Sequence, residues 1–128
     1  MVIDSSAFLA IFLNEPERAH FLRLLVEDGA RLVSAGTLLE TSITLEAKRG
    51  ESAGVDLDVF VHRLQIDIVP VDAAQVEIAR AAWRRFGKGR HPAALNYGDC
   101  FAYALAKSSG EPLLAKGKDF ERTDIRLC

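Results

Sequence analysis

Short apolar strands separated by longer helical stretches are the feature of this sequence that most restricts its fold. The intervening stretches carry apolar residues at helical spacing and end near Gly or Pro. This alternation predicts an α/β fold: a mostly parallel sheet of four or five strands with helices on both faces. The strands are expected at residues 2–3, 31–34, 65–70 and 113–115, with a final edge strand at 125–127.

The helices between these strands have recognisable start and stop signals. Ser5 or Ser6 suits the N-cap of the first helix, Ser34 suits that of the third, and Gly50 ends the third. In residues 88–95, Gly and Pro interrupt any helical pattern, so a loop is expected there. The six helices are expected at residues 7–13, 17–27, 35–49, 55–64, 72–87 and 96–107.

Length and composition are those of an ordinary globular protein. The chain has 128 residues, of which 49% are hydrophobic and 27% charged, and is expected to form one domain over residues 1–128. The net charge of −2 gives no global basic field, so any contact with nucleic acid needs a local patch. Cys100 and Cys128 have neither metal-site spacing nor a disulfide framework, which favours a reducing, cytoplasmic compartment. The apolar N-terminal stretch stops at Asn14, so no signal peptide or membrane span is expected.

Four acidic residues are expected to meet at one edge of the sheet. Asp4 ends the first strand, and Asp119 follows the fourth strand closely. Glu40 lies in the helix after the second strand, and Asp99 lies in the first turn of the helix that leads towards the fourth. Parallel strands joined by right-handed crossovers present their carboxyl ends on one edge, where open α/β sheets build their sites. All four carboxylates can therefore converge.

Each acid also has an ordinary structural role open to it. Asp4 suits the cap of the following helix, and Asp99 stands three residues after Asn96, the spacing of a capping box. Asp119 suits a turn, and Glu40 is expected to be partly buried. If all four acids had only structural roles, their position at the same sheet edge would be a coincidence. We favour this interpretation less.

A cation would let these carboxylates stay ionised side by side. Clustered carboxylates repel each other, so without a cation some of them must take up protons. Oxygen ligands with no histidine nearby in sequence favour Mg²⁺ or Mn²⁺ over zinc. Such a site suits phosphoryl chemistry, because the metal holds phosphate oxygens and activates water for in-line attack. The sequence has no phosphate-cradling P-loop and no Ser-His-acid order.

The acids stand in stretches that resemble a known family. These stretches are residues 2–7, 34–40, 96–106 and 112–120. Together with the matching spacing between them, they extend the resemblance over nearly the whole chain. The ordered set resembles a PIN domain, and closely the VapC-type toxin ribonucleases of bacterial toxin–antitoxin pairs. The resemblance implies a PIN-like three-layer fold and Mg²⁺-dependent cleavage of RNA. It also implies inhibition by a small VapB-type antitoxin, and a homodimer.

The resemblance assigns roles to individual residues. The residues that match Asp4 and Asp99 chiefly hold the metal, and Glu40 belongs with them to the catalytic acids. Ser6 matches a family hydroxyl two residues after the first acid and is expected to contact the substrate. Its alternative role is a helix cap, and the two roles are compatible.

The last acid is the point at which the sequence departs from the family. Many members carry this acid nearer the strand end, where this chain has Lys116. Asp119 is expected to take the role by reaching back, and Asp124 is the alternative.

RNA contact is expected from basic residues beside the acids. Arg85, Lys88 and Arg90 belong to the densest basic run, which ends just before the helix of Asp99. Lys116 flanks the exit of the fourth strand. Phosphates need such neutralisation. The alternative for the run is a solvated helix C-terminus, where Arg also suits the helix dipole.

Other functions share part of this pattern. A phosphatase of the haloacid dehalogenase type also begins with a strand that ends in aspartate, but it needs a second aspartate where Ser6 stands. A receiver domain needs an aspartate after the third strand, which here ends at Pro70. A catalytically silent PIN-like module that binds RNA or a partner would not need intact acids at all the matching positions. RNA cleavage with Mg²⁺, compared with cleavage in chelator, separates these classes.

The first two helices are expected to offer an apolar surface to the antitoxin. Helices that are apolar nearly all round need a second partner layer. The alternative is that both faces are consumed within the monomer. The apolar residues that exceed one buried face are Phe8, Leu9, Ile11, Phe12, Leu13, Phe21, Leu22, Leu24 and Leu25.

Overall fold

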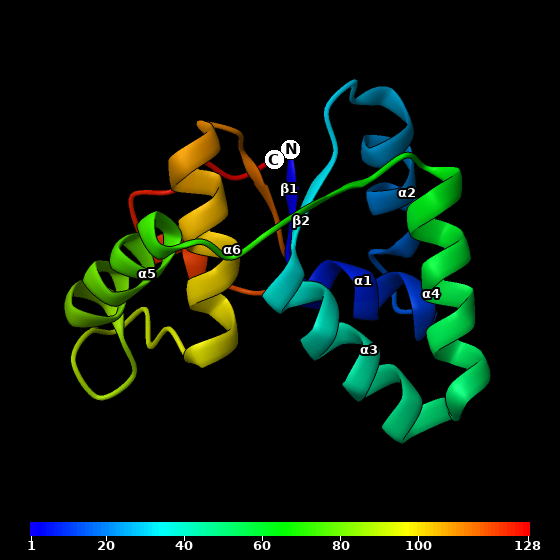
Figure 1. Ribbon diagram of the computed structural model, residues 1–128, viewed down its shortest axis with the longest axis horizontal. Helices are drawn as coiled ribbons and strands as arrows, with labels where there is room; N and C mark the ends of the chain where they lie inside the picture. Colours follow the sequence, from blue (N-terminus) through cyan, green and yellow to red (C-terminus); the bar gives the residue numbers. More distant parts are fainter.

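A four-stranded parallel sheet separates two groups of helices in the computed structural model, which describes residues 1–128 (Figure 1). All three strand pairings are parallel, so the predicted α/β fold class is confirmed. The expected edge strand at 125–127 is reduced to one parallel bridge between Leu113 and Leu127. In the order β3-β2-β1-β4, the strands are β1 (Val2–Ile3), β2 (Leu32–Ser34), β3 (Asp67–Val69) and β4 (Leu113–Leu114).

Six α-helices connect the strands, and none of them combines the length and apolar character that crossing a membrane requires. Ser34 caps α3 as predicted, accepting a hydrogen bond from the Gly36 N–H at 3.3 Å. α4 begins earlier than predicted, because Gly50 (φ 85°) ends α3 and reverses the chain within one residue. The helices are α1 (Ser5–Phe12), α2 (Arg18–Glu27), α3 (Ala35–Arg49), α4 (Glu51–Arg63), α5 (Ala73–Phe86) and α6 (Tyr97–Ser109), followed by a 3-10 helix at Phe120–Arg122.

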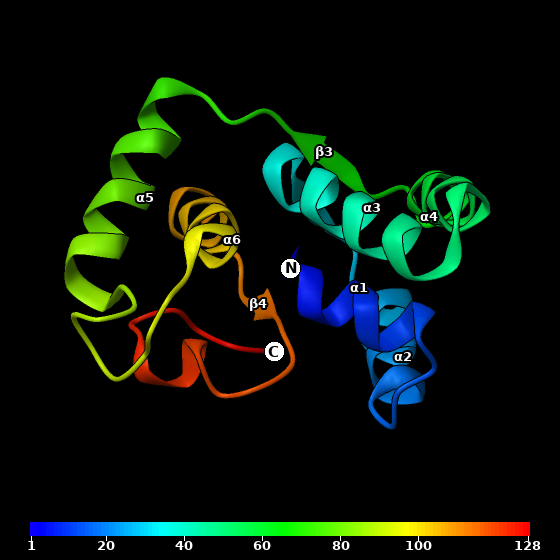
Figure 2. The same ribbon diagram turned by 90° about the horizontal axis from the view of Figure 1, so that it is seen from below.

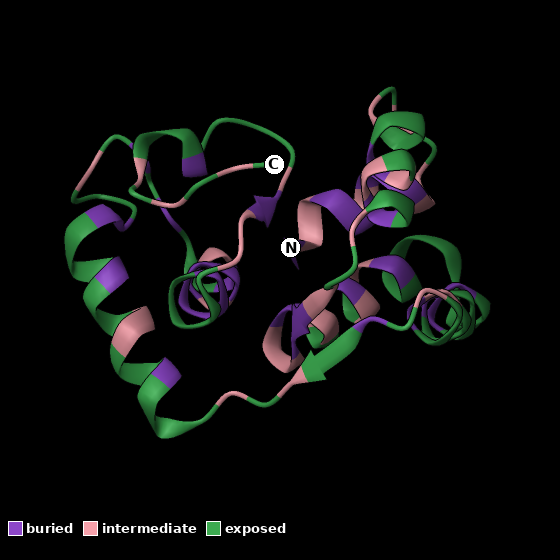
Figure 3. Ribbon diagram, turned by 90° about the horizontal axis from the view of Figure 1, so that it is seen from above, coloured by how far each residue is buried: buried purple, intermediate pink, exposed green.

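Alternate residues of the central strands face two different cores. Ile3 and Leu114 pack against α1, α2, α4 and the C-terminal half of α3, whereas Val2 and Leu113 pack against α5 and α6. Figure 2 shows these helix groups on opposite sides of β1 and β4. This period of two is that of a strand buried on both faces, which explains why the strands are continuous apolar runs. Only the edge strand β3 is largely exposed (Figure 3).

The apolar residues of α1 and α2 pack largely within the monomer, which favours the alternative that both faces are consumed there, and an antitoxin groove on these helices stays a prediction. Phe60 of α4 supplies the second layer, with its ring centroid 6.3 Å from that of Phe8 and 5.3 Å from that of Phe12. Four of the nine residues are buried and the other five pack, partly buried, against the same core: Phe8, Ile11, Phe21 and Leu25, then Leu9, Phe12, Leu13, Leu22 and Leu24.

The central strands β1 and β4 end together at one edge of the sheet. Ile3 pairs with Leu114, and the Asp4 N–H donates to the Leu114 carbonyl at 3.0 Å. The chain that follows β4 therefore leaves the sheet beside Asp4. The fold thus supplies the edge at which the predicted acids are expected to meet.

Candidate active site

Asp4 is anchored at the end of β1 and has one carboxylate oxygen without a partner. Its Oδ2 accepts hydrogen bonds from the Ser6 N–H at 3.0 Å and from the Ser6 hydroxyl at 2.6 Å. Asp4, rather than Ser5 or Ser6, is therefore the N-cap of α1. Only 2% of Asp4 is exposed, and its Oδ1 is buried with no hydrogen-bond partner. A buried carboxylate oxygen in this state needs a cation or a proton.

Burial dominates the electrostatics of Asp4. Removal from water raises the pKa of this carboxyl, the Ser6 hydrogen bonds oppose that rise, and the charge of Glu40 adds to it. The ionised form of Asp4 is thus destabilised in the chain alone. A cation beside Oδ1 would reverse this effect.

Ser6 connects the ends of β1 and β4. Its hydroxyl donates to Asp4 and accepts from the Lys116 N–H at 2.9 Å. The hydroxyl therefore orients Asp4 and holds the chain after β4 against α1. Contact between Ser6 and a substrate stays a prediction.

Asp99 is fixed by the first turn of α6. Its N–H donates to the Asn96 side chain and its Oδ2 accepts from the Asn96 N–H, both at 2.9 Å, which completes the expected capping box. Burial raises the pKa of Asp99 to about 6, with further increases from the charges of Asp4, Asp119 and Glu40 and a decrease from the Asn96 N–H. The capping role therefore does not remove Asp99 from the acidic cluster.

Glu40 reaches the same turn from α3, and Asp119 lies in the loop after β4. The Glu40 carboxylate lies against Gly98, the residue before Asp99, and Glu40 is partly buried as predicted. Asp119 is exposed, yet its charge also raises the pKa of Asp99. The four predicted acids thus influence one another, on the edge where the sequence pattern put them.

Asp124, the alternative last acid, is held elsewhere. Its Oδ1 accepts from the Tyr103 hydroxyl at 2.7 Å, and its Oδ2 accepts from the Lys107 ammonium at 2.6 Å. These hydrogen bonds, that of Lys107 first, lower the pKa of Asp124. Asp124 fastens the C-terminal segment to α6, so the geometry favours Asp119 as the last acid.

The cations of the basic run before α6 differ in whether they have an acidic partner. Arg85 pairs with Asp124 at 3.5 Å, and the Arg90 guanidinium lies over the Trp83 ring, 4.2 Å from its centroid. Lys88 is exposed and has no ion pair. Lys88 and Arg90 therefore keep their charges free of acidic partners, whereas Arg85 does not.

Lys116 has acidic partners that the sequence pattern did not indicate. Its ammonium pairs with Glu15 and also lies 3.3 Å from Glu17, in the connection between α1 and α2. These contacts raise the pKa of the Lys116 ammonium, Glu15 foremost. In the sequence, only the opposite charges of Lys116 and Glu15 could have indicated this pair. Opposite charge alone does not identify a partner about a hundred residues away. Lys116 therefore links the loop after β4 to the connection between α1 and α2, at the edge of the sheet that carries the acids.

The donors at this edge fit a hard divalent cation. All are carboxylate oxygens, the ligands that Mg²⁺ and Mn²⁺ prefer, and the unpartnered Oδ1 of Asp4 is available. No group of three or more His, Cys, Asp or Glu side chains is close enough to hold one ion together. The observation that supports a metal is therefore the free oxygen of Asp4 beside other acids.

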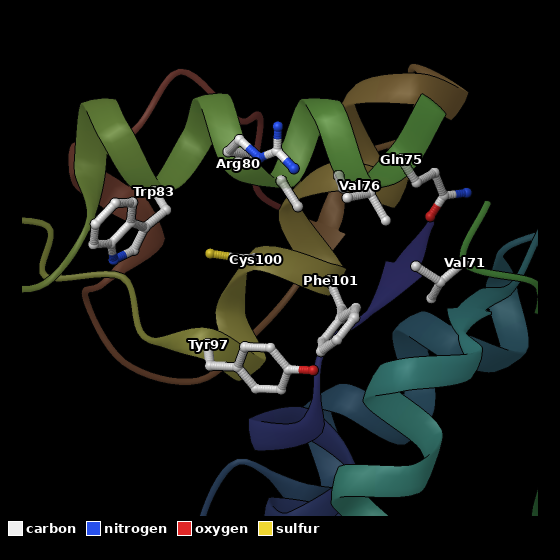
Figure 4. A pocket seen from close by; sticks show the side chains of 10 residues that line it. Val71, Gln75, Val76, Arg80, Trp83, Tyr97, Cys100 and Phe101 are labelled. Atoms are coloured by element: carbon white, nitrogen blue, oxygen red, sulfur yellow. The ribbon is translucent and has the colours of Figure 1, made fainter. Parts of the chain in front are cut away.

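A concave, mostly apolar surface lies between α5 and α6. The cavity has a volume of about 450 Å³, and its walls include Val76, Trp83, Tyr97 and Phe101 (Figure 4). No carboxylate lines it, so it is separate from the acidic site. Tyr97 is 82% exposed at its rim.

Comparison with known sequences finds close relatives over nearly the full chain. The family model of the PIN domain matches residues 1–126. The protein named Ribonuclease VapC30 of Mycobacterium tuberculosis is 52% identical over 125 residues, which are 98% of this chain and 95% of the relative. The protein named Ribonuclease VapC of Mycolicibacterium smegmatis is 50% identical, over 98% of this chain and 97% of the relative.

Comparison with solved structures finds the same fold at lower identity. Mycobacterium tuberculosis VapC20, described as a Sarcin-Ricin loop cleaving toxin, has a TM-score of 0.79 and 19% identity, covering 97% of this chain and 95% of its own. The DNA-bound VapBC structure from Salmonella typhimurium has a TM-score of 0.76 and 20% identity, covering 99% and 95%. At these identities the likeness shows the fold.

The raised pKa of Asp99 predicts how the Asp99→Asn variant responds to pH without metal. The folded protein holds this proton more tightly than the unfolded chain, so the stability that the group contributes falls as pH rises from about 4 to about 6. The variant should therefore gain stability over the parent across this window and keep a constant advantage above it. Urea unfolding in chelator, at several pH values, measures the difference. An advantage that does not change with pH would contradict the assigned environment of Asp99.

Proposed function

The chain belongs to the PIN-domain family and, within it, to the VapC ribonucleases, and we propose that it cleaves RNA with Mg²⁺ held by Asp4 and Asp99. The predicted family is confirmed, and membership makes the chain a ribonuclease toxin of a toxin–antitoxin pair. The metal, its ligands and the RNA path are the parts that we propose. The observation that supports them is the buried, unpartnered Oδ1 of Asp4, an acid whose charge acts on Asp99 together with those of Glu40 and Asp119.

The residues at this edge of the sheet have different roles in the proposed reaction. When bound, Mg²⁺ (or Mn²⁺) stabilises charge on phosphate oxygens and makes water more acidic. Asp4 and Asp99 hold the ion, and Ser6 holds Asp4 in place. Water would attack phosphorus as the bond to the leaving oxygen breaks; Glu40 or Asp119 would accept the proton that the water releases, and the leaving oxygen would take a proton from solvent.

The alternative functions have less support. A silent module that binds RNA or a partner would leave the acids without a purpose, since the burial of Asp4 and Asp99 and the repulsion of Asp99 by the other three acids are destabilising. A metal-dependent phosphatase of the haloacid dehalogenase type needs an acid where Ser6 stands.

We propose that RNA phosphates approach across the loop before α6. Lys88 and Arg90 are exposed there and have no acidic partner, so they suit phosphate contact best. Arg85 and Lys116 share their charge with acids of the chain and are expected to contribute less. Ser6 remains a proposed substrate contact at the strand ends.

We propose a VapB-type antitoxin as the protein partner, by analogy with the solved VapBC assemblies of similar fold. Because α1 and α2 use their apolar residues internally, the carboxylate edge is the better supported target. A basic side chain of the antitoxin would satisfy the same negative charge that the cation does. A cytoplasmic location remains part of this proposal.

We also propose a homodimer, formed through the apolar face that α3, α5 and α6 share. On this face Leu39 is 62% exposed, Ile43 60% and Tyr97 82%, next to the cavity walled by Trp83. Exposed apolar side chains grouped in this way mark an interface. A second copy of the chain carries the same apolar face, so it is the partner that we propose.

Asp4→Asn and Asp99→Asn should each lower Mg²⁺-dependent RNA cleavage at least about 100-fold while the protein stays folded. Loss of one ligand leaves the cation under-coordinated, and loss of one charge relieves repulsion among the acids. Single-turnover cleavage of labelled RNA, with Mg²⁺ and with chelator, gives the rates. Glu121→Gln, an exposed acid beside Asp119, is the control and should cleave like the parent. Parental rates in either Asn variant would refute the metal assignment.

Lys88→Gln combined with Arg90→Gln should weaken RNA binding and flatten its salt dependence. Each lost phosphate contact should reduce the slope of log affinity against log salt by roughly one unit. Fluorescence anisotropy over a salt series measures the slope, in Ca²⁺ to prevent cleavage. The control is Lys48→Gln combined with Arg49→Gln, two exposed cations at the end of α3. Equal slopes for the two double variants would put the RNA path elsewhere.

Light scattering should give the chain alone a mass twice 14.0 kDa, and Ile43→Asp should return it to 14.0 kDa. Val55→Asp on α4 is the matched control, because Val55 is also 60% exposed but lies off the proposed face. A monomeric parent, or dimers in both variants, would contradict the interface. Coexpression with the reading frame immediately upstream tests the antitoxin in the same measurement, as a stable increase in mass.

A further inference from the structure

A glycine stands in the first turn of α6 where nothing in its own backbone requires one. Gly98 is buried between Tyr97 and Asp99, and it is not among the residues with positive φ. Glycine weakens a helix relative to alanine because it loses more backbone freedom on folding. The reason for Gly98 must therefore lie in what approaches it.

The approaching group is the carboxylate of Glu40. A Cβ built on Gly98 would lie 1.9 Å from Glu40 Oε2, 2.6 Å from its Cδ and 2.7 Å from its Oε1. These separations are well inside van der Waals contact, so no side chain fits while Glu40 stays in place. The Glu40 carboxylate also lies at the N-terminal end of α6, where the helix dipole favours negative charge.

We propose that Gly98 is a positioning residue of the metal site: its missing side chain lets the Glu40 carboxylate lie against the first turn of α6, beside Asp99. This inference rests on the proposed function, since the cation is what Asp4 and Asp99 would hold and what the Glu40 charge would lie near. With Ala at position 98, Glu40 must move out of the cluster, and the cation loses one of its negative neighbours.

The displaced group is mobile, so the effect should fall on the site rather than on the fold. All three near atoms belong to the far end of the Glu40 side chain. That side chain borders an open groove between α3 and α6, lined also by Leu39 and Thr44, into which it has room to turn. An added methyl group should therefore leave the melting temperature nearly unchanged.

The chain contains a second glycine with the same geometry outside the site. A Cβ on Gly54 of α4 would lie 2.1 Å from Glu46 Oε1 and 3.0 Å from its Cδ. Gly54→Ala thus creates the same kind of clash with a glutamate that has no part in the acidic cluster. It is the control for any general effect of crowding a carboxylate against a helix.

The test compares the parent, Gly98→Ala, Gly54→Ala, Glu40→Gln and the double variant of Gly98→Ala with Glu40→Gln. Mn²⁺ alone is the probe, with its dissociation constant measured by calorimetry or by electron paramagnetic resonance in the absence of RNA. Melting temperatures and Mg²⁺-dependent RNA cleavage are measured alongside. Glu40→Gln keeps the shape of the side chain and removes its charge, so it separates displacement of the charge from distortion of α6.

Gly98→Ala is expected to weaken Mn²⁺ binding about tenfold or more, as loss of a supporting group does, while Gly54→Ala binds like the parent. In the Glu40→Gln background, Gly98→Ala should add nothing, because the charge on which it acts is already absent. An unchanged dissociation constant for Gly98→Ala would overturn the inference, as would an equal loss in the Glu40→Gln background or a melting temperature far below that of Gly54→Ala. If the parent itself neither binds Mn²⁺ nor cleaves RNA, the proposed function fails together with the inference.

Discussion

Burial of the Asp4 carboxylate is the constraint on which the rest of the site depends. One oxygen of Asp4 is satisfied by Ser6, and the other is buried without a partner. Burial raises the pKa of this acid and the charge of Glu40 adds to the rise, while Asp4, Asp119 and Glu40 together raise the pKa of Asp99. A folded chain keeps such an arrangement only if function requires it, and a divalent cation is the species that turns this repulsion into attraction. The destabilising cluster and the proposed activity thus have the same physical origin.

The fold keeps the acids together through short connections of different kinds. Pairing of β1 with β4 fixes the edge, and the Ser6 hydroxyl links the Asp4 carboxylate to the Lys116 backbone. α6 brings Asp99 through its own cap, so the residues that start the helix also orient the acid. α3 brings Glu40, which comes close because Gly98 has no side chain. Each acid is therefore held by a different element, which is how a repulsive cluster survives in a small protein.

Much of this was predictable from the sequence because it follows from local patterns. Apolar runs predicted the strands, cap residues predicted α3 and α6, and the order of strands and helices put four acids on one edge. Contacts between distant residues were not predictable, as Lys116 with Glu15 and Asp124 with Tyr103 show, because charge and hydrogen-bonding type do not identify a partner. The packing of the apolar residues of α1 and α2 could not be predicted for a related reason: their number does not reveal that Phe60 of α4 packs against Phe8 and Phe12.

We propose that the edge formed by Asp4, Glu40, Asp99 and Asp119 holds a divalent cation. Anomalous diffraction from crystals of the chain grown with Mn²⁺ tests it most directly. We expect a single strong peak within about 2.5 Å of Asp4 Oδ1, with Asp99 as a second ligand, and no such peak in crystals of Asp4→Asn. Mn²⁺ bound only at other surfaces, or an Asp4 Oδ1 still without a partner at saturating Mn²⁺, would contradict it.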